Sequence, residues 1–166
     1  MNTTNFKNDI LHSFKSCSSP PIILCLGNSR FTCDIFAPLV GELLTKKYNI
    51  KTLVLGNLTN NVTAKNFIDF NNAVKINFPY KKIFVIDSSF SYLESFGKLK
   101  FLNCGIKPGQ AIGFQSKSVG DFSLLANINI LSVVNNKISS FTRAYIAENL
   151  AITSSKLIYD CFNSSF

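Results

Sequence analysis

Histidine and arginine are scarce in this chain, and glycine-rich phosphate-binding motifs are missing from it. Its 166 residues include one histidine, His12, and two arginines. A single histidine excludes a histidine-rich metal centre. It also disfavours a Ser-His-Asp or Cys-His catalytic arrangement, because His12 precedes the first predicted strand and would have to fold back onto the site. Neither G-x-G-x-x-G nor G-x-x-x-x-G-K-S/T occurs, so we expect no nucleotide-binding loop of either kind, no metal and no cofactor.

Paired cysteines and long apolar runs are also lacking. The five cysteines are odd in number and form no C-x-x-C pair, which argues against a disulfide framework, a zinc site and a thioredoxin-type site. No apolar run approaches the roughly 20 residues that cross a bilayer. Residues 1–19 are polar and have no apolar core of a secretory signal. We therefore expect a cytoplasmic protein without a membrane partner.

Positive charge is in excess, with a formal net charge of +8. The lysines are dispersed and occur in pairs at most, and arginine, the usual residue for bidentate phosphate and guanine contacts, is rare. We therefore expect no specific nucleic-acid partner. The charge is compatible with an acidic protein or peptide as substrate.

The composition favours one folded domain, since 46% of the residues are hydrophobic and 16% are charged. Residues 1–19 are predicted to be a polar N-terminal arm, either mobile or carrying a short helix over 10–14 that lies on the domain. Residues 20–166 are predicted to be a single domain.

The first half of the chain alternates strands and helices. Apolar runs predict strands at 22–26, 52–55 and 83–86, and helical periodicity predicts helices at 34–48 and 64–78. The order β-α-β-α-β argues for a parallel sheet with right-handed crossovers.

The second half changes pattern. Residues 98–102 alternate between polar and apolar, 107–109 are a turn signal, and 119–130 contain another strand, which predicts a mixed sheet with antiparallel additions. A last helix is predicted over 139–162. Its expected apolar contacts are Phe141, Tyr145, Leu150, Leu157 and Ile158.

Two aspartates follow predicted strands. Asp34 comes after the first strand and its turn, and Asp87 ends the third strand. The carboxyl ends of parallel strands meet at one crevice, so the two carboxyls can face each other there. A close pair of carboxyls can divide the roles of acid and base. For Asp34 the alternative is an N-cap of the following helix; Asp87 needs a partner or access to solvent in any case.

The turn after the first strand supplies further candidates. Its backbone N–H groups, from Gly27 to Cys33, would suit an anion or an oxyanion. Arg30 can pair with either aspartate or with a substrate carboxylate, and Cys33 is expected to be a packed small residue. Asp121 is either a turn residue or a third acidic group. The expected substrate-binding residues are Gly27, Asn28, Ser29, Arg30, Thr32 and Asp121.

Four motifs follow one another along the chain: Leu26-Gly27-x-x-Arg30-x-Thr32-x-Asp34-x-x-x-Pro38-Leu39-Val40-Gly41, Ile86-Asp87, Lys107-Pro108-Gly109 and Val119-Gly120-Asp121. This ordered set resembles the YyaC-type sporulation proteins, a family described as spore proteases. The resemblance runs from about residue 20 to the last helix. It implies a three-layer α/β/α, phosphorylase/hydrolase-like domain with a mixed, mostly parallel sheet, as in the germination protease of spore-forming bacteria and the hydrogenase maturation proteases.

The resemblance implies a function and a site. By motif, Asp34 and Asp87 correspond to the aspartates proposed to hydrolyse peptide bonds in the germination protease, which implies an endopeptidase of the spore or sporulating cell. Small acid-soluble spore proteins are the implied substrate. Ser29 and Cys33 depart from the family motif, which usually has aspartate and glycine there, so a peptide-binding or regulatory module without turnover is the alternative. An anion- or small-molecule-binding protein is a weaker one.

Overall fold

A five-stranded sheet forms the centre of the molecule, in the strand order β2-β1-β3-β5-β4. The structure is a computed structural model that describes residues 3–110, 113, 115–131 and 137–166. The strands are β1 (Ile22–Cys25), β2 (Val54–Leu55), β3 (Ile83–Ser91), β4 (Leu99–Leu102) and β5 (Phe122–Ile130). Strands β1, β2, β3 and β5 run parallel, and β4 is antiparallel to β5.

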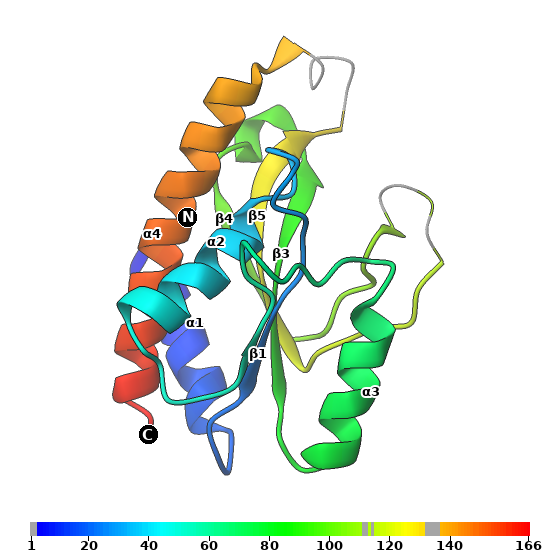
Figure 1. Cartoon of the computed structure of the whole chain (residues 1–166). Coiled ribbons are helices and arrows are strands. Elements are labelled where there is room, and N and C mark those ends of the chain that lie inside the picture. Colours follow the sequence, from blue (N-terminus) through cyan, green and yellow to red (C-terminus); the bar gives the residue numbers. More distant parts are fainter. Residues whose placement is uncertain (1–2, 111–112, 114, 132–136) are drawn as a thin grey trace.

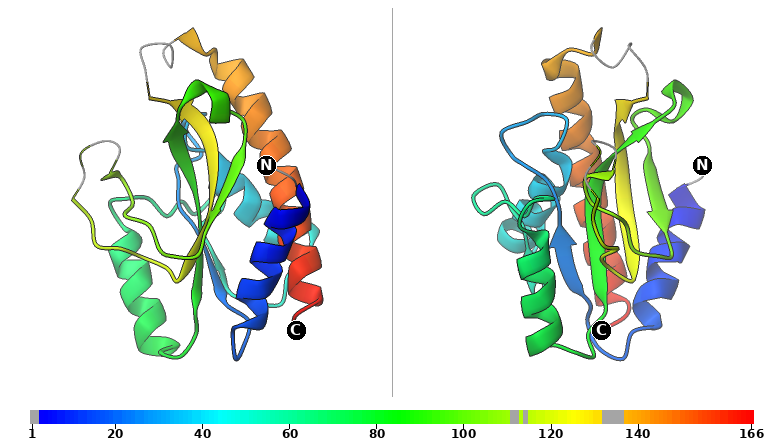
Figure 2. Two further views of the ribbon diagram at one scale, coloured as in Figure 1. Left: turned by 180° about the vertical axis from the view of Figure 1, so that it is seen from behind. Right: turned by 90° about the vertical axis from the view of Figure 1, so that its right-hand side faces the viewer.

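Helices cover both faces of this sheet. One face carries α1 (Thr3–Lys15), α2 (Phe36–Glu42) with a π-helical continuation η1 (Leu43–Lys47), and α4 (Ser140–Asn163). The other face carries α3 (Phe67–Asn77), and a short 3-10 turn, η2 (Leu93–Ser95), follows β3. Figures 1 and 2 show these layers from three directions. The predicted three-layer α/β/α domain with a mixed, mostly parallel sheet is confirmed.

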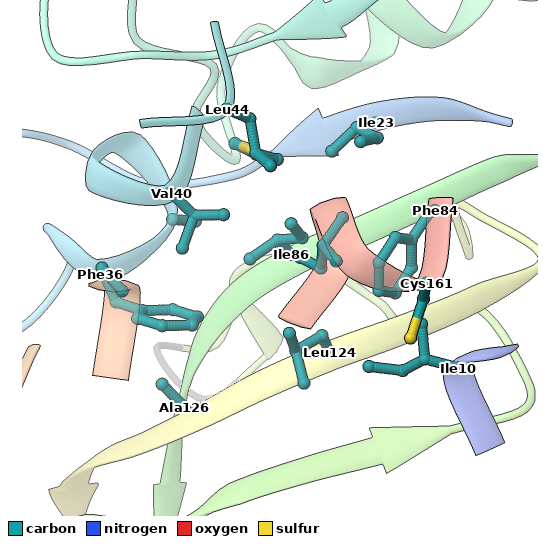
Figure 3. Packing of buried hydrophobic residues seen from close by; sticks show 14 of the residues in the cluster. Ile10, Ile23, Phe36, Val40, Leu44, Phe84, Ile86, Leu124, Ala126 and Cys161 are labelled. Carbon is teal, nitrogen blue, oxygen red and sulfur yellow. The ribbon is translucent and has the colours of Figure 1, made fainter. Parts of the chain in front are cut away.

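The apolar runs of the central strands are buried because helices lie on both sides of them. All four residues of β1 and the first four of β3 are buried. Figure 3 shows the larger core cluster, in which side chains of β1, β3 and β5 meet those of α1, α2 and α4. Aromatic rings contact one another in this cluster: the ring centroids of Phe84 and Phe122 lie 5.0 Å apart, and those of Phe84 and Phe14 5.5 Å apart.

The N-terminal segment contributes to this core. Helix α1 is longer than the short helix over 10–14 that the sequence suggests, and Phe6, Ile10 and Phe14 are buried on its inner face. The helix packs on α4, where the Cys161 thiol lies 3.7 Å from the carbonyl oxygen of Lys7. The segment 3–15 is therefore polar on one face only, with three large apolar residues on the other.

The last helix makes only part of its predicted core contacts. Phe141 and Tyr145 are 82% and 61% exposed, so the prediction that they make core contacts is wrong. Leu150 and Leu157 are partly buried against the core and Ile158 is fully buried. Four small residues of α4 are fully buried, which allows the helix to lie close to the sheet and to α2. The other buried residues of α4 are Arg143, Ala147, Ala151, Ser154, Ser155, Cys161 and Phe162.

Glycine at position 41 is required for the contact between α2 and the sheet edge. A Cβ atom there would lie 1.9 Å from the carbonyl oxygen of Gly56 and 3.3 Å from the sulfur of Cys25. We expect Gly41→Ala to lower the free energy of unfolding by about 2–4 kcal/mol, since backbone must move to admit the methyl group. Urea unfolding of the variant and of the wild type checks this. Equal stability of Gly41→Ala and wild type would contradict the close approach.

Candidate active site

The two aspartates leave neighbouring central strands. The register of β1 with β3 ends at Cys25 opposite Ile86, which places the turn after β1 beside Asp87. The prediction that β3 ends at Asp87 is wrong. The strand continues to Ser91, with β5 as its partner. Side chains alternate along a strand, so Asp87 lies on the face of Val85, which packs in the smaller core cluster with α3.

A tight loop brings Asp34 back to the end of β1. The N–H of Asn28 donates to the carbonyl oxygen of Asp34 at 3.2 Å, and the N–H of Asp34 donates to that of Phe31 at 2.9 Å. Gly27 allows this closure because a Cβ atom there would lie 2.3 Å from the Asp34 carbonyl oxygen and 2.9 Å from Cδ of Pro38. The loop therefore places Asp34 next to the C-terminal end of β1.

Asp34 and Asp87 line one cavity of about 820 Å³. Residues 105–110 and Ser118, which lie between β4 and β5, form another wall. Most of the lining is apolar, and Lys107 brings a positive charge. The other lining residues are Leu26, Gly27, Phe31, Cys33, Ala64, Ser88, Ser89, Phe90, Gly105, Ile106, Pro108, Gly109, Gln110, Ser118, Leu125, Asn129 and Leu131.

Burial and proximity change the acidity of both carboxyls. Burial raises the pKa of Asp34 to about 6, against a smaller opposite effect of a hydrogen bond from the Asn28 backbone. Burial also raises the pKa of Asp87 well above its usual range, and the neighbouring Asp34 carboxylate raises it further. The N–H of Ser88, 2.7 Å from Oδ1 of Asp87, acts in the opposite direction. Asp34, with a pKa of about 6, is ionised at neutral pH, and its charge favours the protonated form of the buried Asp87.

The alternative role of Asp34 as an N-cap is wrong. The N-cap of α2 is Ile35, and no side chain accepts a hydrogen bond from the first turn. Asp34 lies outside the helix, in the loop, which leaves its carboxyl available to the cavity.

The predicted binding residues are only partly brought together. Gly27 lines the cavity, whereas Asn28, Ser29, Arg30 and Thr32 are outside its lining. Ser29 faces residues 57–61: its hydroxyl donates to the carbonyl oxygen of Leu58 at 3.0 Å, and its N–H donates to Oδ1 of Asn61. Arg30 is exposed, and the ion pairs found among the described residues, Lys46 with Glu42 and Lys156 with Asp160, do not include it.

Most backbone N–H groups of this loop donate hydrogen bonds within the protein. Besides those of Asn28 and Asp34, the N–H of Gly27 donates to Val62, that of Phe31 to Asn28, and that of Arg30 to the Asn28 side chain. With Ser29 bound to Asn61, most of the donors expected to hold an anion are already engaged. The predicted oxyanion role of this loop therefore does not apply to those groups.

Asp121 lies at the other end of the sheet. Its Oδ2 accepts a hydrogen bond of 2.8 Å from the N–H of Ile83, the first residue of β3. The structure therefore does not bring Asp121 to the aspartate pair, and the turn interpretation describes its position.

Sequence reasoning missed two buried polar residues near the pair, Asn129 and Arg143. Asn129 lines the cavity, and its amide donates to the carbonyl oxygen of Cys33 at 3.0 Å. Arg143 donates to Oδ1 of Asn129 at 2.6 Å. Cys33 itself is exposed at the cavity rather than packed as a small core residue. An asparagine in an apolar strand and an arginine in an amphipathic helix were the available signals, because buried polar groups need partners.

Two further findings concern the same described part of the chain. It contains no group of three or more His, Cys, Asp or Glu side chains arranged to hold a metal ion. No helix in it is both long and apolar enough to cross a membrane.

We expect Asp34→Asn to stabilise the protein at neutral pH. The folded-state pKa of about 6 exceeds the ordinary value of 3.8, so the stability that Asp34 contributes below pH 3.8 is lost as the pH rises through 6. The substitution removes this loss, up to about 3 kcal/mol at pH 7. Urea unfolding should show the gain at pH 7 and little at pH 4. Asp69→Asn, at an exposed site in the first turn of α3, should show no gain at either pH, because the aspartate there interacts favourably with the helix N-terminus. A gain that is equal at both pH values would contradict this prediction.

Comparison with known proteins gives two matches. Residues 1–156 match the model of a family described as "Protein of unknown function (DUF1256)". The chain is also 25% identical over 137 residues to "Uncharacterized protein YyaC" of Bacillus subtilis (strain 168), which covers 82% of this chain and 67% of that protein. These matches confirm the resemblance to the YyaC-type family over most of the chain.

Proposed function

The chain belongs to the DUF1256 family of proteins of unknown function, and on that premise we propose that it is an endopeptidase with Asp34 and Asp87 as its catalytic pair. The observation that carries this proposal is the placement of both carboxyls on the wall of one cavity, with pKa values raised to different extents. Such a pair holds an ionised base beside a protonated acid at neutral pH.

The pKa values assign the roles. Asp34, ionised above about pH 6, accepts a proton from water as the water oxygen forms a bond to the peptide carbonyl carbon. Asp87, whose pKa is raised by burial and by the Asp34 carboxylate, donates its proton to the amide nitrogen as the C–N bond breaks. The products are a carboxylic acid and an amine, and proton exchange with water restores the pair. Cleavage should therefore increase as the pH rises through 6 and decrease when Asp87 loses its proton.

The cavity also supports a peptide as substrate. Its volume of about 820 Å³ and its mostly apolar lining suit several side chains rather than a small ion. The net charge of +8 and the lining Lys107 favour an acidic partner. Small acid-soluble spore proteins are proposed as the substrate on the family resemblance, which also carries the proposed location in the spore or sporulating cell.

Intact-mass analysis tests this function. The chain is incubated at pH 5, 7 and 9 with a small acid-soluble spore protein and, separately, with a broad peptide pool. Discrete fragments at pH 7 that diminish at pH 5 would support the proposed pair. No fragment from either substrate would contradict an endopeptidase.

The alternative is a module that binds a peptide and does not cleave it. The mostly apolar cavity favours it equally, because binding requires no proton transfer. Retention of intact peptides from the same pool, without fragments, would support this alternative over the peptidase.

A further inference from the structure

Arg143 is a buried cation close to the proposed site. It lies on α4, 6% exposed, and its Nη1 atom donates hydrogen bonds of 2.8 Å to the carbonyl oxygen of Ile128 and 2.6 Å to Oδ1 of Asn129. Removing a guanidinium from water is costly unless hydrogen bonds replace its hydration. A buried arginine held at the end of β5 therefore indicates a specific structural task.

The arginine determines the orientation of the Asn129 amide. Arginine has only donors, so the atom of Asn129 that faces it must be the oxygen. The NH₂ group of Asn129 then points the other way, where it donates to the carbonyl oxygen of Cys33 at 3.0 Å. Asn129 is 4% exposed, so water offers little competition for either bond.

The Cys33 carbonyl is the last link to the aspartate pair. It belongs to the peptide unit that joins Cys33 to Asp34, and the N–H of the same unit donates to the carbonyl oxygen of Phe31 at 2.9 Å. A peptide unit is planar, so bonds at its oxygen and at its nitrogen fix the plane. The direction in which the Asp34 side chain leaves the backbone is thereby restricted.

We propose that Arg143 and Asn129 are positioning residues that hold Asp34 beside Asp87 through the backbone of Cys33. The inference rests on the proposed function, because it takes the aspartate pair as the functional site. Neither residue acts on the reacting atoms. Burial is the main cause of the raised pKa of Asp34, so loosening the loop should admit water to this carboxyl and lower its pKa.

The first test is Asn129→Ala, which removes both bonds of the amide. Carbon-13 NMR of the aspartate carboxyls should show the pKa of Asp34 moving from about 6 toward 3.8, by about one unit or more. Asn149→Ala is the matched control: Asn149 is exposed on the same α4, and its amide donates to the Tyr145 carbonyl oxygen. It should leave the Asp34 titration unchanged.

Arg143→Lys tests the second link while retaining the positive charge. Lysine lacks the planar guanidinium that reaches both oxygens, so the Asp34 pKa should decrease by less than in Asn129→Ala. A folded Asn129→Ala protein with the wild-type Asp34 titration would overturn the proposal. If the variants do not fold, hydrogen exchange of the side-chain NH₂ group of Asn129 in the wild-type protein tests the proposal. Slow exchange supports the hydrogen bonds from Arg143 through Asn129 to Cys33, and exchange at the rate of a free amide overturns the proposal.

These readouts do not use a substrate. A shifted Asp34 titration without any peptide cleavage would retain the positioning network and reject the proposed peptidase. Cleavage by the wild-type protein, together with an unshifted Asp34 titration in Asn129→Ala, would support the peptidase and reject the positioning network.

Discussion

Replacing Asp87 by asparagine is expected to reduce peptide-bond cleavage by about 10²- to 10⁴-fold, the usual contribution of one general acid or base. Asparagine keeps the size of the side chain and cannot deliver the proton that the leaving nitrogen needs. Asp34→Asn should cause a loss of similar size, because no base then takes the proton from water. Rates of fragment formation from the peptide pool measure both effects.

The double variant provides a further test of the pair. When two residues act as one catalytic unit, removing the second causes little further loss, so Asp34→Asn combined with Asp87→Asn should reduce the cleavage rate about as much as either substitution alone. Asp69→Asn, at an exposed position on α3, is the matched control and should retain full cleavage. Circular dichroism must first show that each variant is folded. Folded variants of Asp34 and Asp87 with more than about a tenth of the wild-type rate would reject general acid–base roles of this size.

Phe14→Ala is expected to lower the free energy of unfolding by about 3–5 kcal/mol, the range for a buried phenylalanine. Its ring is fully buried and lies 5.5 Å from that of Phe84 and 6.0 Å from that of Phe122. Truncation would leave a cavity in the aromatic centre of the core. Urea unfolding followed by circular dichroism measures the loss, and Phe14→Leu, with a smaller expected loss, serves if the alanine variant does not fold.

Phe141→Ala is the matched control for Phe14→Ala. The sequence predicts Phe141 as a core residue of the last helix, whereas its side chain is 82% exposed. We therefore expect a change within about 0.5 kcal/mol. Comparable losses of stability at positions 14 and 141 would contradict the burial of Phe14 and the exposure of Phe141.

The central strands and the aspartate pair are predictable from the sequence because each has a strong local signal. The runs at 22–26 and 83–86 are apolar on every residue, which is typical of strands covered on both faces. Asp34 and Asp87 follow such runs, and strand order alone then places them at one crevice.

The packing of α4 and α1 is not predictable in this way. In α4 the large Phe141 and Tyr145 are exposed, whereas the small Ala147 and Ala151, which an apolar pattern does not bring out, are fully buried. In α1, three large apolar residues are spread among polar ones at a spacing of four, within a segment whose composition is polar. Composition therefore obscures the buried face in α1, and residue size obscures it in α4.

The buried polar residues beside the site are harder still to predict from the sequence. Asn129 acquires its role from Cys33, which lies 96 positions earlier in the chain, and from Arg143 on α4. Nothing local marks a strand asparagine as a link between a loop and a helix. Such roles depend on tertiary distances, which a single sequence does not contain.

The contact of α1 with α4 has a consequence for synthesis on the ribosome. Helix α1 leaves the ribosome before α4, on which it packs, and Lys7 and Cys161 at their contact are separated by 154 positions. At about 5–20 residues per second, the interval between the two is on the order of ten seconds. Throughout this time Phe6, Ile10 and Phe14 have no α4 to cover them. We therefore expect nascent chains stalled before residue 140 to bind chaperones through α1, and to release them when α4 emerges.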